Sequence, residues 1–203
     1  MVLDLHQRGI RSSRVLAAID RVPRERFVPE GVRHLSYADR ALPIDCSQTI
    51  SQPYIVALMS EALQLSGGEH VLEVGTGSGY QAAVLAELAG SVVSVERHAE
   101  LSRRANALLS DLGYTNITTV VGDGTLGWPE LAPYDRIIVA AAAHHIPRAL
   151  ESQLAEGGIL VIPVGGPSGQ ELQALHKVGG RLQSRWLSGC RFVPLVGAQD
   201  EPL

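Results

Sequence analysis

Three glycines at alternate positions, directly after a short apolar run, limit the fold of this 203-residue chain more than any other feature. The run Val-Leu-Glu-Val at 71–74 predicts a strand, and Gly75, Gly77 and Gly79 follow it within Gly-Thr-Gly-Ser-Gly-Tyr. Glycines at such a point let the backbone turn tightly and approach a ligand closely, while the next helix points its N-terminus at that ligand. The loop therefore predicts a strand–loop–helix unit that binds a small molecule, with a plain tight turn as the alternative.

Short β-branched runs alternate with Ala- and Leu-rich runs around this loop, which is the pattern of crossover units and a parallel sheet. Strands are expected at residues 70–74, 91–95, 117–121, 135–140 and 158–163, and helices at 78–88, 99–112 and 147–154. The runs 171–178 and 181–186 flank Gly179-Gly180 and predict a β-hairpin, and a last strand is expected at 191–195. We therefore predict an α/β fold of the Rossmann-like, doubly wound type, with a mostly parallel seven-stranded sheet, an antiparallel C-terminal part and a helical N-terminal extension.

The whole chain is expected to form a single domain, because no repeat, low-complexity tract or Pro/Gly/Ser-rich linker divides it. Its length lies near the upper end of one ordinary domain. Residues 1–65 form the helical and loop-rich extension, and residues 66–203 form the α/β core that carries the glycine loop. In the extension, Ser12 or Ser13 is a candidate N-cap for a helix through Ile19.

The charge balance argues against a nucleic-acid partner. The formal net charge is −4, whereas duplex-binding proteins usually carry a basic face. The basic residues are scattered, and we interpret the cluster of Arg21, Arg24 and Arg26 as solvated surface.

Cysteine usage and hydropathy point to a cytoplasmic protein that does not enter membranes. Cys46 and Cys190 are too few for a disulfide scaffold and have no Cys-x-x-Cys partners, so we expect reduced thiols and no metal site. The longest apolar stretch, 137–143, is far shorter than the ~20 residues that span a bilayer. The N-terminus lacks the features of a secretory signal. We expect a monomer.

Acidic residues at the ends of successive predicted strands narrow the choice of ligand. The glycine spacing from Gly75 is typical of methyltransferases, whereas Gly-Ser-Gly-Tyr-Gln-Ala from Gly77 also satisfies the relaxed dinucleotide pattern. Glu96, about 20 residues past the loop, can accept hydrogen bonds from a ribose, which both NAD and S-adenosylmethionine carry. Asp123 and Gly124 follow the third strand, where a methyltransferase needs a carboxylate for the adenine amino group, although Asp-Gly is also a common turn pair. Together with Glu73 in the first strand, this arrangement favours an S-adenosylmethionine-dependent methyltransferase over a dehydrogenase.

Motifs along nearly the whole chain make it resemble the protein-L-isoaspartate O-methyltransferases. The most specific are Gln-Thr-Ile-Ser-Gln-Pro at 48–53 and Arg-Phe-Val-Pro-Leu at 191–195. The glycine loop alone would identify only the superfamily. Further matches lie at 22–29, 37–39, 41–44, 71–85, 94–97, 122–124, 127–129, 132–135 and 159–165.

The resemblance implies an activity and a role for several residues. The family methylates the free α-carboxylate of L-isoaspartyl residues in aged proteins and peptides, yielding S-adenosylhomocysteine and an ester that collapses to a succinimide. Ser51 corresponds to the family's active-site serine, Thr49 and Ile50 border donor and substrate, and the cofactor loop brings in Gly75, Thr76 and Gly77. Likewise, Arg97 follows Glu96 in the cofactor site, and Val193, Pro194 and Leu195 are expected to hold the substrate backbone.

Two departures from the family pattern keep other hypotheses open. Where the family usually has glycines, this chain reads Asp45-Cys46-Ser47, which keeps open a methyltransferase for an aspartate of a dedicated peptide or protein. His144-His145 stands where a proline is usual, and we interpret the pair as loop or pocket-rim residues. A nucleotide-binding module without catalysis is the hypothesis from another class. Tyr37 and Tyr54 are candidates for a lid.

Overall fold

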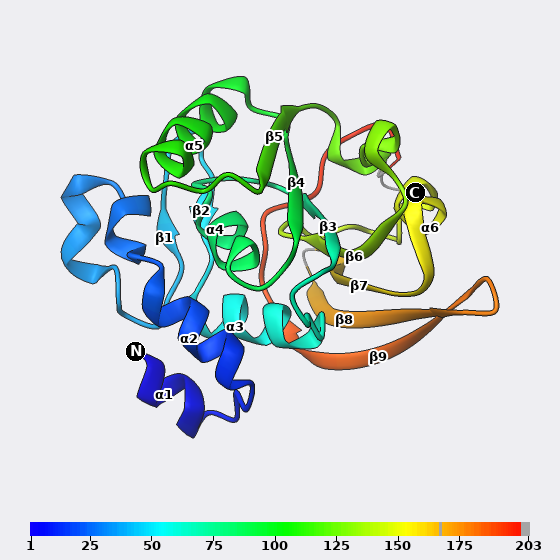
Figure 1. Ribbon diagram of the computed structural model, residues 1–203, viewed down its shortest axis with the longest axis horizontal. Coiled ribbons are helices and arrows are strands. Elements are labelled where there is room, and N and C mark those ends of the chain that lie inside the picture. Colours follow the sequence, from blue (N-terminus) through cyan, green and yellow to red (C-terminus); the bar gives the residue numbers. More distant parts are fainter. Residues whose placement is uncertain (167, 200–203) are drawn as a thin grey trace.

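A computed structural model describes residues 1–166 and 168–199. Its centre is a seven-stranded sheet in the order β5-β4-β3-β6-β7-β8-β9, in which the first five strands run parallel and the last two antiparallel (Figure 1). The strands are β3 (His70–Val74), β4 (Ser91–Glu96), β5 (Ile117–Val121), β6 (Tyr134–Val139), β7 (Leu154–Gly166), β8 (Gly169–Val178) and β9 (Arg181–Cys190). This confirms the predicted α/β fold with a parallel first part and an antiparallel C-terminal part.

Side-chain alternation along the strands builds a core on each face of the sheet. Val71, Val92 and Ile138 pack with Met59 and Leu85, which come from helices α3 (Pro53–Ala62) and α4 (Tyr80–Ala86). Their neighbours in the strands, such as Leu72, Val93 and Ile137, face the opposite side and pack with Leu150 of helix α6 (Arg148–Gln153) and with Leu154. Because both faces are covered, the central strands are mostly apolar, with Glu73 and Ser94 as buried polar exceptions.

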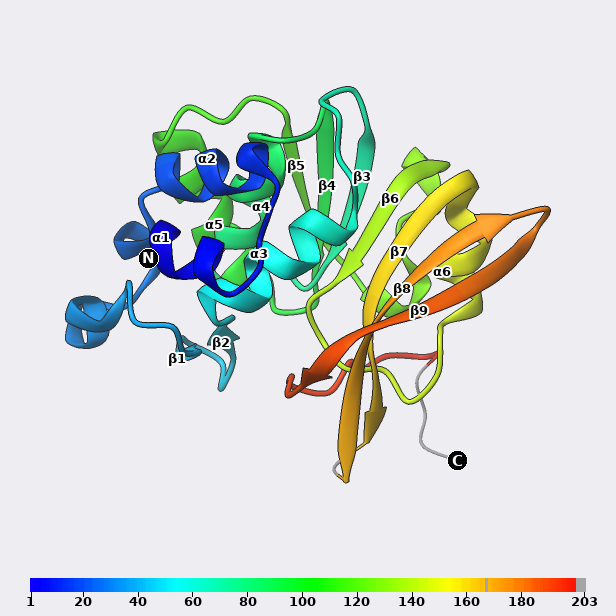
Figure 2. The same cartoon turned by 90° about the horizontal axis from the view of Figure 1, so that it is seen from below.

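The N-terminal extension packs on the outside of α4 and α5 (Ala99–Asp111), at the end of the molecule opposite the hairpin β8–β9 (Figure 2). It contains α1 (Val2–Gln7), α2 (Ser13–Arg21), the 3₁₀ helices η1 (Arg24–Phe27) and η2 (Glu30–Leu35), and the short paired strands β1 (Leu42–Pro43) and β2 (Thr49–Ile50). Ser12 is the N-cap of α2, because its side chain accepts a hydrogen bond from the amide of Val15. The extension therefore brings residues 42–52 toward the glycine loop.

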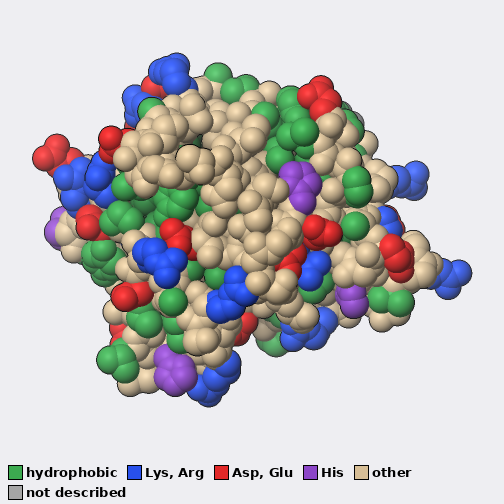
Figure 3. Space-filling model, viewed as in Figure 1, with side chains coloured by type: hydrophobic (Ala, Val, Ile, Leu, Met, Phe, Trp, Pro, Cys, Tyr) green, Lys and Arg blue, Asp and Glu red, His purple; other side chains and the backbone are tan. Residues whose placement is uncertain are grey.

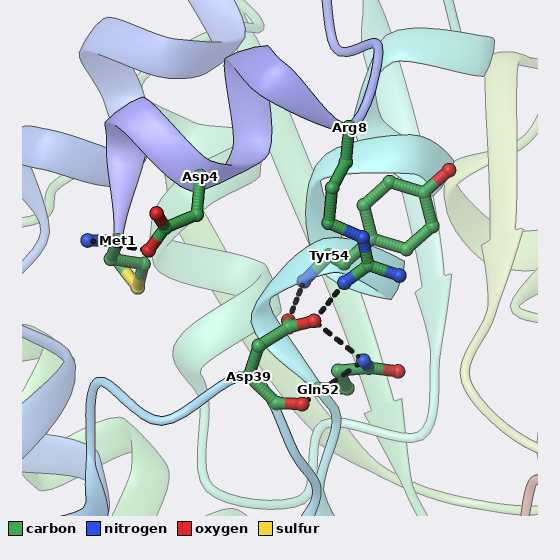
Figure 4. A network of polar contacts seen from close by, with 6 residues as sticks. All are labelled: Met1, Asp4, Arg8, Asp39, Gln52 and Tyr54. Carbon is green, nitrogen blue, oxygen red and sulfur yellow. Dashed lines mark hydrogen bonds and ion pairs between the residues drawn. The ribbon is translucent and has the colours of Figure 1, made fainter.

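Asp39 ties the extension to the start of α3 (Figure 4). Its carboxylate accepts hydrogen bonds from the amide of Tyr54 at 2.9 Å and from the Gln52 side chain at 2.8 Å, and it forms an ion pair with Arg8. The Arg8 guanidinium in turn lies 3.7 Å from the centre of the Tyr54 ring. A carboxylate at a helix N-terminus is favourable because it meets free amides and the positive end of the helix dipole. The network fixes the segment that directly follows Ser51.

Two expectations from the sequence are wrong. Residues 191–195 form no regular strand; they make one isolated parallel bridge, in which the Ala142 amide donates to the Val193 carbonyl and the Leu195 amide donates to the Ala142 carbonyl. Pro194 has no N–H and cannot extend the pairing. The second wrong expectation is that Arg24 is solvated surface. Arg21 and Arg26 do form surface ion pairs, but Arg24 is completely buried.

In the described residues, no helix is long and apolar enough to cross a membrane.

Candidate active site

A cleft opens at the carboxyl ends of β3, β4 and β6, and most of the predicted site residues line it. Its walls come from separate parts of the chain: β2 with the residues that flank it, the glycine loop with the start of α4, the end of β4, Gly124, the residues after β6 and the segment after β9. A concave site with both apolar and polar residues in its walls suits a small organic ligand. The predicted residues in its walls are Thr49, Ile50, Ser51, Gly75, Thr76, Gly77, Glu96, Arg97, Gly124, Val193, Pro194 and Leu195.

The glycine loop has a backbone that other residues adopt only at a cost. Gly75, Gly77 and Gly79 have φ values of 94°, 54° and 88°, and Gly79 is the N-cap of α4. Residues with a Cβ are disfavoured in this left-handed region. The Gly75 amide donates to the carbonyl of Val95 at 2.8 Å, which fastens the start of the loop to β4. The alternating glycines are therefore explained by three left-handed positions in five residues.

Glu96 supports this loop and still has capacity for a ligand. Its side chain is 5% exposed, and one carboxylate oxygen accepts from the Gly77 amide while the other accepts from the His98 amide, both at 2.9 Å. An ionised carboxylate offers about four lone-pair directions. The two that remain can accept from neighbouring hydroxyls such as those of a ribose.

Glu73 lies behind the cleft wall and not in it. The side chain is fully buried, one carboxylate oxygen accepts from the Ser94 hydroxyl, and the other has no partner in the described part of the chain. Ser94 is also hydrogen-bonded to Thr76 of the loop at 2.5 Å. Burial raises the pKa of Glu73 to about 8, with a smaller increase from the charge of Glu96, although the Ser94 hydrogen bond lowers it. The acid is therefore largely protonated at neutral pH and supports the loop through Ser94.

Asp123 stands next to the cleft and holds the C-terminal segment. Its carboxylate accepts hydrogen bonds from the amide and the hydroxyl of Thr125, at 2.9 and 2.7 Å, and from the amide of Ala198 at 2.8 Å. Although burial raises the pKa of Asp123, these hydrogen bonds bring it below its ordinary value, so the group stays ionised. Gly124, its neighbour, lines the cleft and packs against Val74 so closely that a Cβ would lie 2.3 Å from that side chain.

Asp123→Ala is expected to weaken S-adenosylhomocysteine binding by roughly 1.5–3 kcal/mol, the worth of a charged hydrogen bond, as measured by titration calorimetry. The matched control is Asp111→Ala, which removes an exposed carboxylate that pairs with Arg26 and does not line the cleft. We expect that control to leave the cofactor Kd unchanged. An unaltered Kd in Asp123→Ala would remove Asp123 from the adenine site.

On the facing wall, a hairpin presents the hydroxyls of Thr49 and Ser51. Strand β1 pairs with β2 in antiparallel register, and Thr49 and Ser51 line the cleft from β2 and the residue after it. Neither hydroxyl forms a hydrogen bond within the described ranges 1–166 and 168–199, so both are available to a ligand.

The tip of this hairpin explains why glycines are usual there in the family. Cys46 and Ser47 have φ values of 56° and 57°, and the Gln48 amide donates to the Asp45 carbonyl at 3.1 Å, which together describe a type I′ turn. Asp45 forms an ion pair with Arg104 of α5 and does not line the cleft. The residues that depart from the family pattern, Asp45-Cys46-Ser47, therefore form the hairpin turn and do not line the cleft.

Replacing Cys46-Ser47 by Asn-Gly should stabilise the protein. The left-handed conformation costs a non-glycine residue roughly 1–2 kcal/mol, whereas an added glycine loses about 0.5–1 kcal/mol in chain entropy. The expected net gain in the free energy of unfolding is therefore about 1 kcal/mol, measured by urea denaturation. Ser47→Val is the opposite control and should lower stability, because a β-branched residue tolerates this φ least. Equal stability of all three proteins would contradict the turn assignment.

Several residues of the cleft escaped the sequence reasoning. Gln48, Tyr80, Gln81 and His98 adjoin the recognised motifs, so proximity to a motif was the signal that could have found them. The proposed lid residues Tyr37 and Tyr54 do not line the cleft. The described residues contain no group of three or more potential metal ligands, and His144 lies near Gly166 and not in the cleft wall.

Comparison with known proteins places this architecture in one family. The family model for protein-L-isoaspartate(D-aspartate) O-methyltransferase matches residues 1–200. A protein-L-isoaspartate O-methyltransferase of Dictyoglomus thermophilum is 56% identical over 193 residues, covering 95% of this chain and 88% of that protein. One solved protein-L-isoaspartate O-methyltransferase superposes with a TM-score of 0.89 at 31% identity, covering 98% of this chain and 65% of the other.

A second structure, from Plasmodium falciparum and described as a protein-L-isoaspartate O-methyltransferase in complex with S-adenosyl-L-homocysteine, has a TM-score of 0.83 at 26% identity and covers 96% of both chains. The match extends over the sheet, the glycine loop and the N-terminal extension alike. This chain belongs to the protein-L-isoaspartate(D-aspartate) O-methyltransferase family.

Proposed function

We propose that this protein transfers a methyl group from S-adenosylmethionine to the free α-carboxylate of L-isoaspartyl residues in damaged proteins and peptides. One observation carries the proposal: a single cleft is lined both by the glycine loop and Glu96 and by Thr49 and Ser51, whose hydroxyls have no hydrogen-bond partner among the described residues. The resulting methyl ester would collapse to a succinimide, whose hydrolysis returns some normal aspartate and so begins repair.

The residues of the cofactor wall fit S-adenosylmethionine. Glu96 has lone pairs left for the ribose hydroxyls, and the backbone at Gly77 can approach a ligand because it carries no side chain. Arg97 and Gly124 complete the same wall, and Asp123 stands beside it for the adenine amino group. When bound, this cofactor supplies an electrophilic methyl group on a sulfonium centre.

The remaining chemistry asks the protein mainly for alignment. A substrate carboxylate has an ordinary pKa near 4 and is already ionised at neutral pH, so no strong general base is needed. Ser51 then acts as a hydrogen-bond donor that orients the carboxylate, with Thr49 beside it, and neither serves as a nucleophile. Holding two reactants in line can be worth roughly 7–11 kcal/mol of the barrier. Val193, Pro194 and Leu195 are proposed to hold the peptide backbone at the open side of the same cleft.

The decisive experiment compares two short peptides that differ only in an aspartyl or an isoaspartyl linkage, with labelled S-adenosylmethionine as donor. We expect label only in the isoaspartyl peptide. Equal labelling of both peptides, or none while S-adenosylhomocysteine still binds, would favour an aspartate in a dedicated peptide or protein as substrate. The feature that supported that second candidate, Asp45, pairs with Arg104 outside the cleft, so we give it less weight.

The partner and the setting of the reaction are also part of the proposal. We infer a monomeric, cytoplasmic enzyme whose substrates are proteins and peptides, with no nucleic-acid or membrane partner. The net charge of −4 supports the inference that no nucleic acid is a partner. On the face seen in Figure 3, basic and acidic side chains lie interspersed. Size-exclusion chromatography with light scattering tests the monomer, since a mass near twice 21.7 kDa would contradict it.

A further inference from the structure

Arg24 is an unusual residue to find in the core of this protein. It has no exposed surface and heads the fully buried side chains in size. Burial lowers the pKa of its guanidinium, yet arginine stays charged in proteins. Within residues 1–166 and 168–199, no carboxylate forms an ion pair with it. A buried, unpaired charge is costly, so its contacts must explain why it is there.

Those contacts join the two sides of the cleft. The guanidinium donates to the carbonyl of Ser51 at 2.7 Å through Nη2 and to the carbonyl of Ser36 at 2.8 Å through Nε. Its central carbon lies 4.7 Å from the centre of the Tyr80 ring. Tyr80 is the first residue of α4, directly after the glycine loop, and it lines the cleft together with Ser51. One planar cation therefore connects the substrate segment, the end of η2 and the helix that follows the glycine loop.

We propose that Arg24 is a positioning residue for the methyl transfer: by holding the Ser51 carbonyl next to Tyr80, it fixes where the Ser51 hydroxyl stands relative to the glycine loop. This inference rests on the proposed function, because it gives Ser51 a role in orienting the substrate. Ser51 lies between strand β2 and the N-cap of α3, and no other side chain in the described residues hydrogen-bonds to its backbone carbonyl. Without Arg24, its peptide group has no fixed partner on that side.

The geometry requires arginine and not merely a positive charge. The planar guanidinium donates to the carbonyls of Ser36 and Ser51 and lies over the Tyr80 ring at the same time. Lysine has a single compact ammonium group and cannot make all three contacts. The other terminal nitrogen, Nη1, is buried without a hydrogen-bond partner in the described residues, as is the hydroxyl of Tyr80. The fork is therefore placed for the two carbonyls and not for all of its own donors.

The test measures kcat, the KM for an isoaspartyl peptide and the Kd for S-adenosylhomocysteine in Arg24→Lys and Arg24→Met. A 1 Å misplacement near a reacting centre can cost 100-fold in rate, so we expect kcat to fall roughly 10- to 100-fold in both variants, with the cofactor Kd nearly unchanged. Arg26→Met is the matched control, because Arg26 belongs to the same 3₁₀ helix but forms an exposed ion pair with Asp111, and it should leave kcat unaltered. If Arg24→Met does not fold, Arg24→Lys carries the test, since it keeps the charge and nearly the volume.

A double-mutant cycle separates positioning from a general loss of structure. If Arg24 acts through Ser51, adding Arg24→Lys to Ser51→Ala should cost little further activity, because the group being positioned is already gone. Additive losses in the cycle, or an undiminished kcat in folded Arg24→Lys, would overturn the inference. The wild-type assay distinguishes the two proposals. If the wild-type protein methylates no isoaspartyl peptide, the proposed function is wrong. If the wild-type protein methylates the peptide and Arg24→Lys has the same kcat, only the proposed role of Arg24 is wrong.

Discussion

Replacing Ser51 by alanine is expected to lower kcat for an isoaspartyl peptide roughly 100-fold, about 2.7 kcal/mol in the barrier, while the Kd for S-adenosylhomocysteine stays nearly the same. The hydroxyl faces the cleft without a partner in the described residues, so it is free to bind a substrate carboxylate. The glycine loop and Glu96, which we assign to the cofactor, lie on the other wall and keep their hydrogen bonds in the variant.

Steady-state kinetics at saturating cofactor, combined with titration calorimetry, check this expectation. The matched control is Ser152→Ala, in which an exposed hydroxyl of α6 is removed far from the cleft residues, and it should behave like the wild type. A Ser51→Ala variant with unchanged kcat would remove Ser51 from the mechanism. A large rise in the cofactor Kd would instead place Ser51 in the cofactor site.

The part of the cleft that we assign to the cofactor was predictable from the sequence because its residues are close together in the chain. A strand, a loop with glycines at 75, 77 and 79, a second strand and Glu96 all fall within residues 70–96. Local rules suffice there: strand patterning, the need for glycine at positive φ, and the convergence of parallel strands at their carboxyl ends. The antiparallel end of the sheet was likewise predictable from Gly179-Gly180 between the two candidate strands at 171–178 and 181–186.

The part of the cleft that we assign to the substrate depends on contacts between residues far apart in sequence, which sequence patterns do not show. Arg24 lies between two other arginines in a polar stretch, and only the folded extension reveals that it reaches Ser51, 27 residues away. From the sequence, Asp45 was expected to place a negative charge close to the substrate, but the turn directs its carboxylate to Arg104. The segment at 191–195 has the composition of a strand, but its backbone hydrogen-bonds only to Ala142 and to the Gln170 side chain within the described residues. In each case tertiary packing decides the outcome over local propensity.

Burial of Glu73 in β3 is expected to make the stability of the protein depend on pH. A carboxylic acid in the motif suggested an acceptor for the cofactor, yet the side chain is fully buried with one oxygen unpartnered in the described residues. Burial raises the pKa of Glu73 to about 8, whereas an unfolded chain titrates near the ordinary value of 4.5. Between these two pH values the folded state binds one more proton than the unfolded state. The stability that Glu73 contributes is therefore fully present below pH 4.5 and is lost as the pH rises toward 8.

The Glu73→Gln variant should remove this dependence. Relative to the variant, the wild type is expected to lose roughly 3 kcal/mol in the free energy of unfolding between pH 4.5 and pH 7, at 1.36 kcal/mol for each pH unit. Urea denaturation of both proteins at closely spaced pH values measures the difference, with Glu30→Gln on the exposed surface as the control that should follow the wild type. Glutamine keeps an acceptor for the Ser94 hydroxyl, so the support of the loop through Thr76 is retained. A pH-independent difference between Glu73→Gln and the wild type would mean that Glu73 is ionised in the folded protein, and that the buried side of the glycine loop holds a charge.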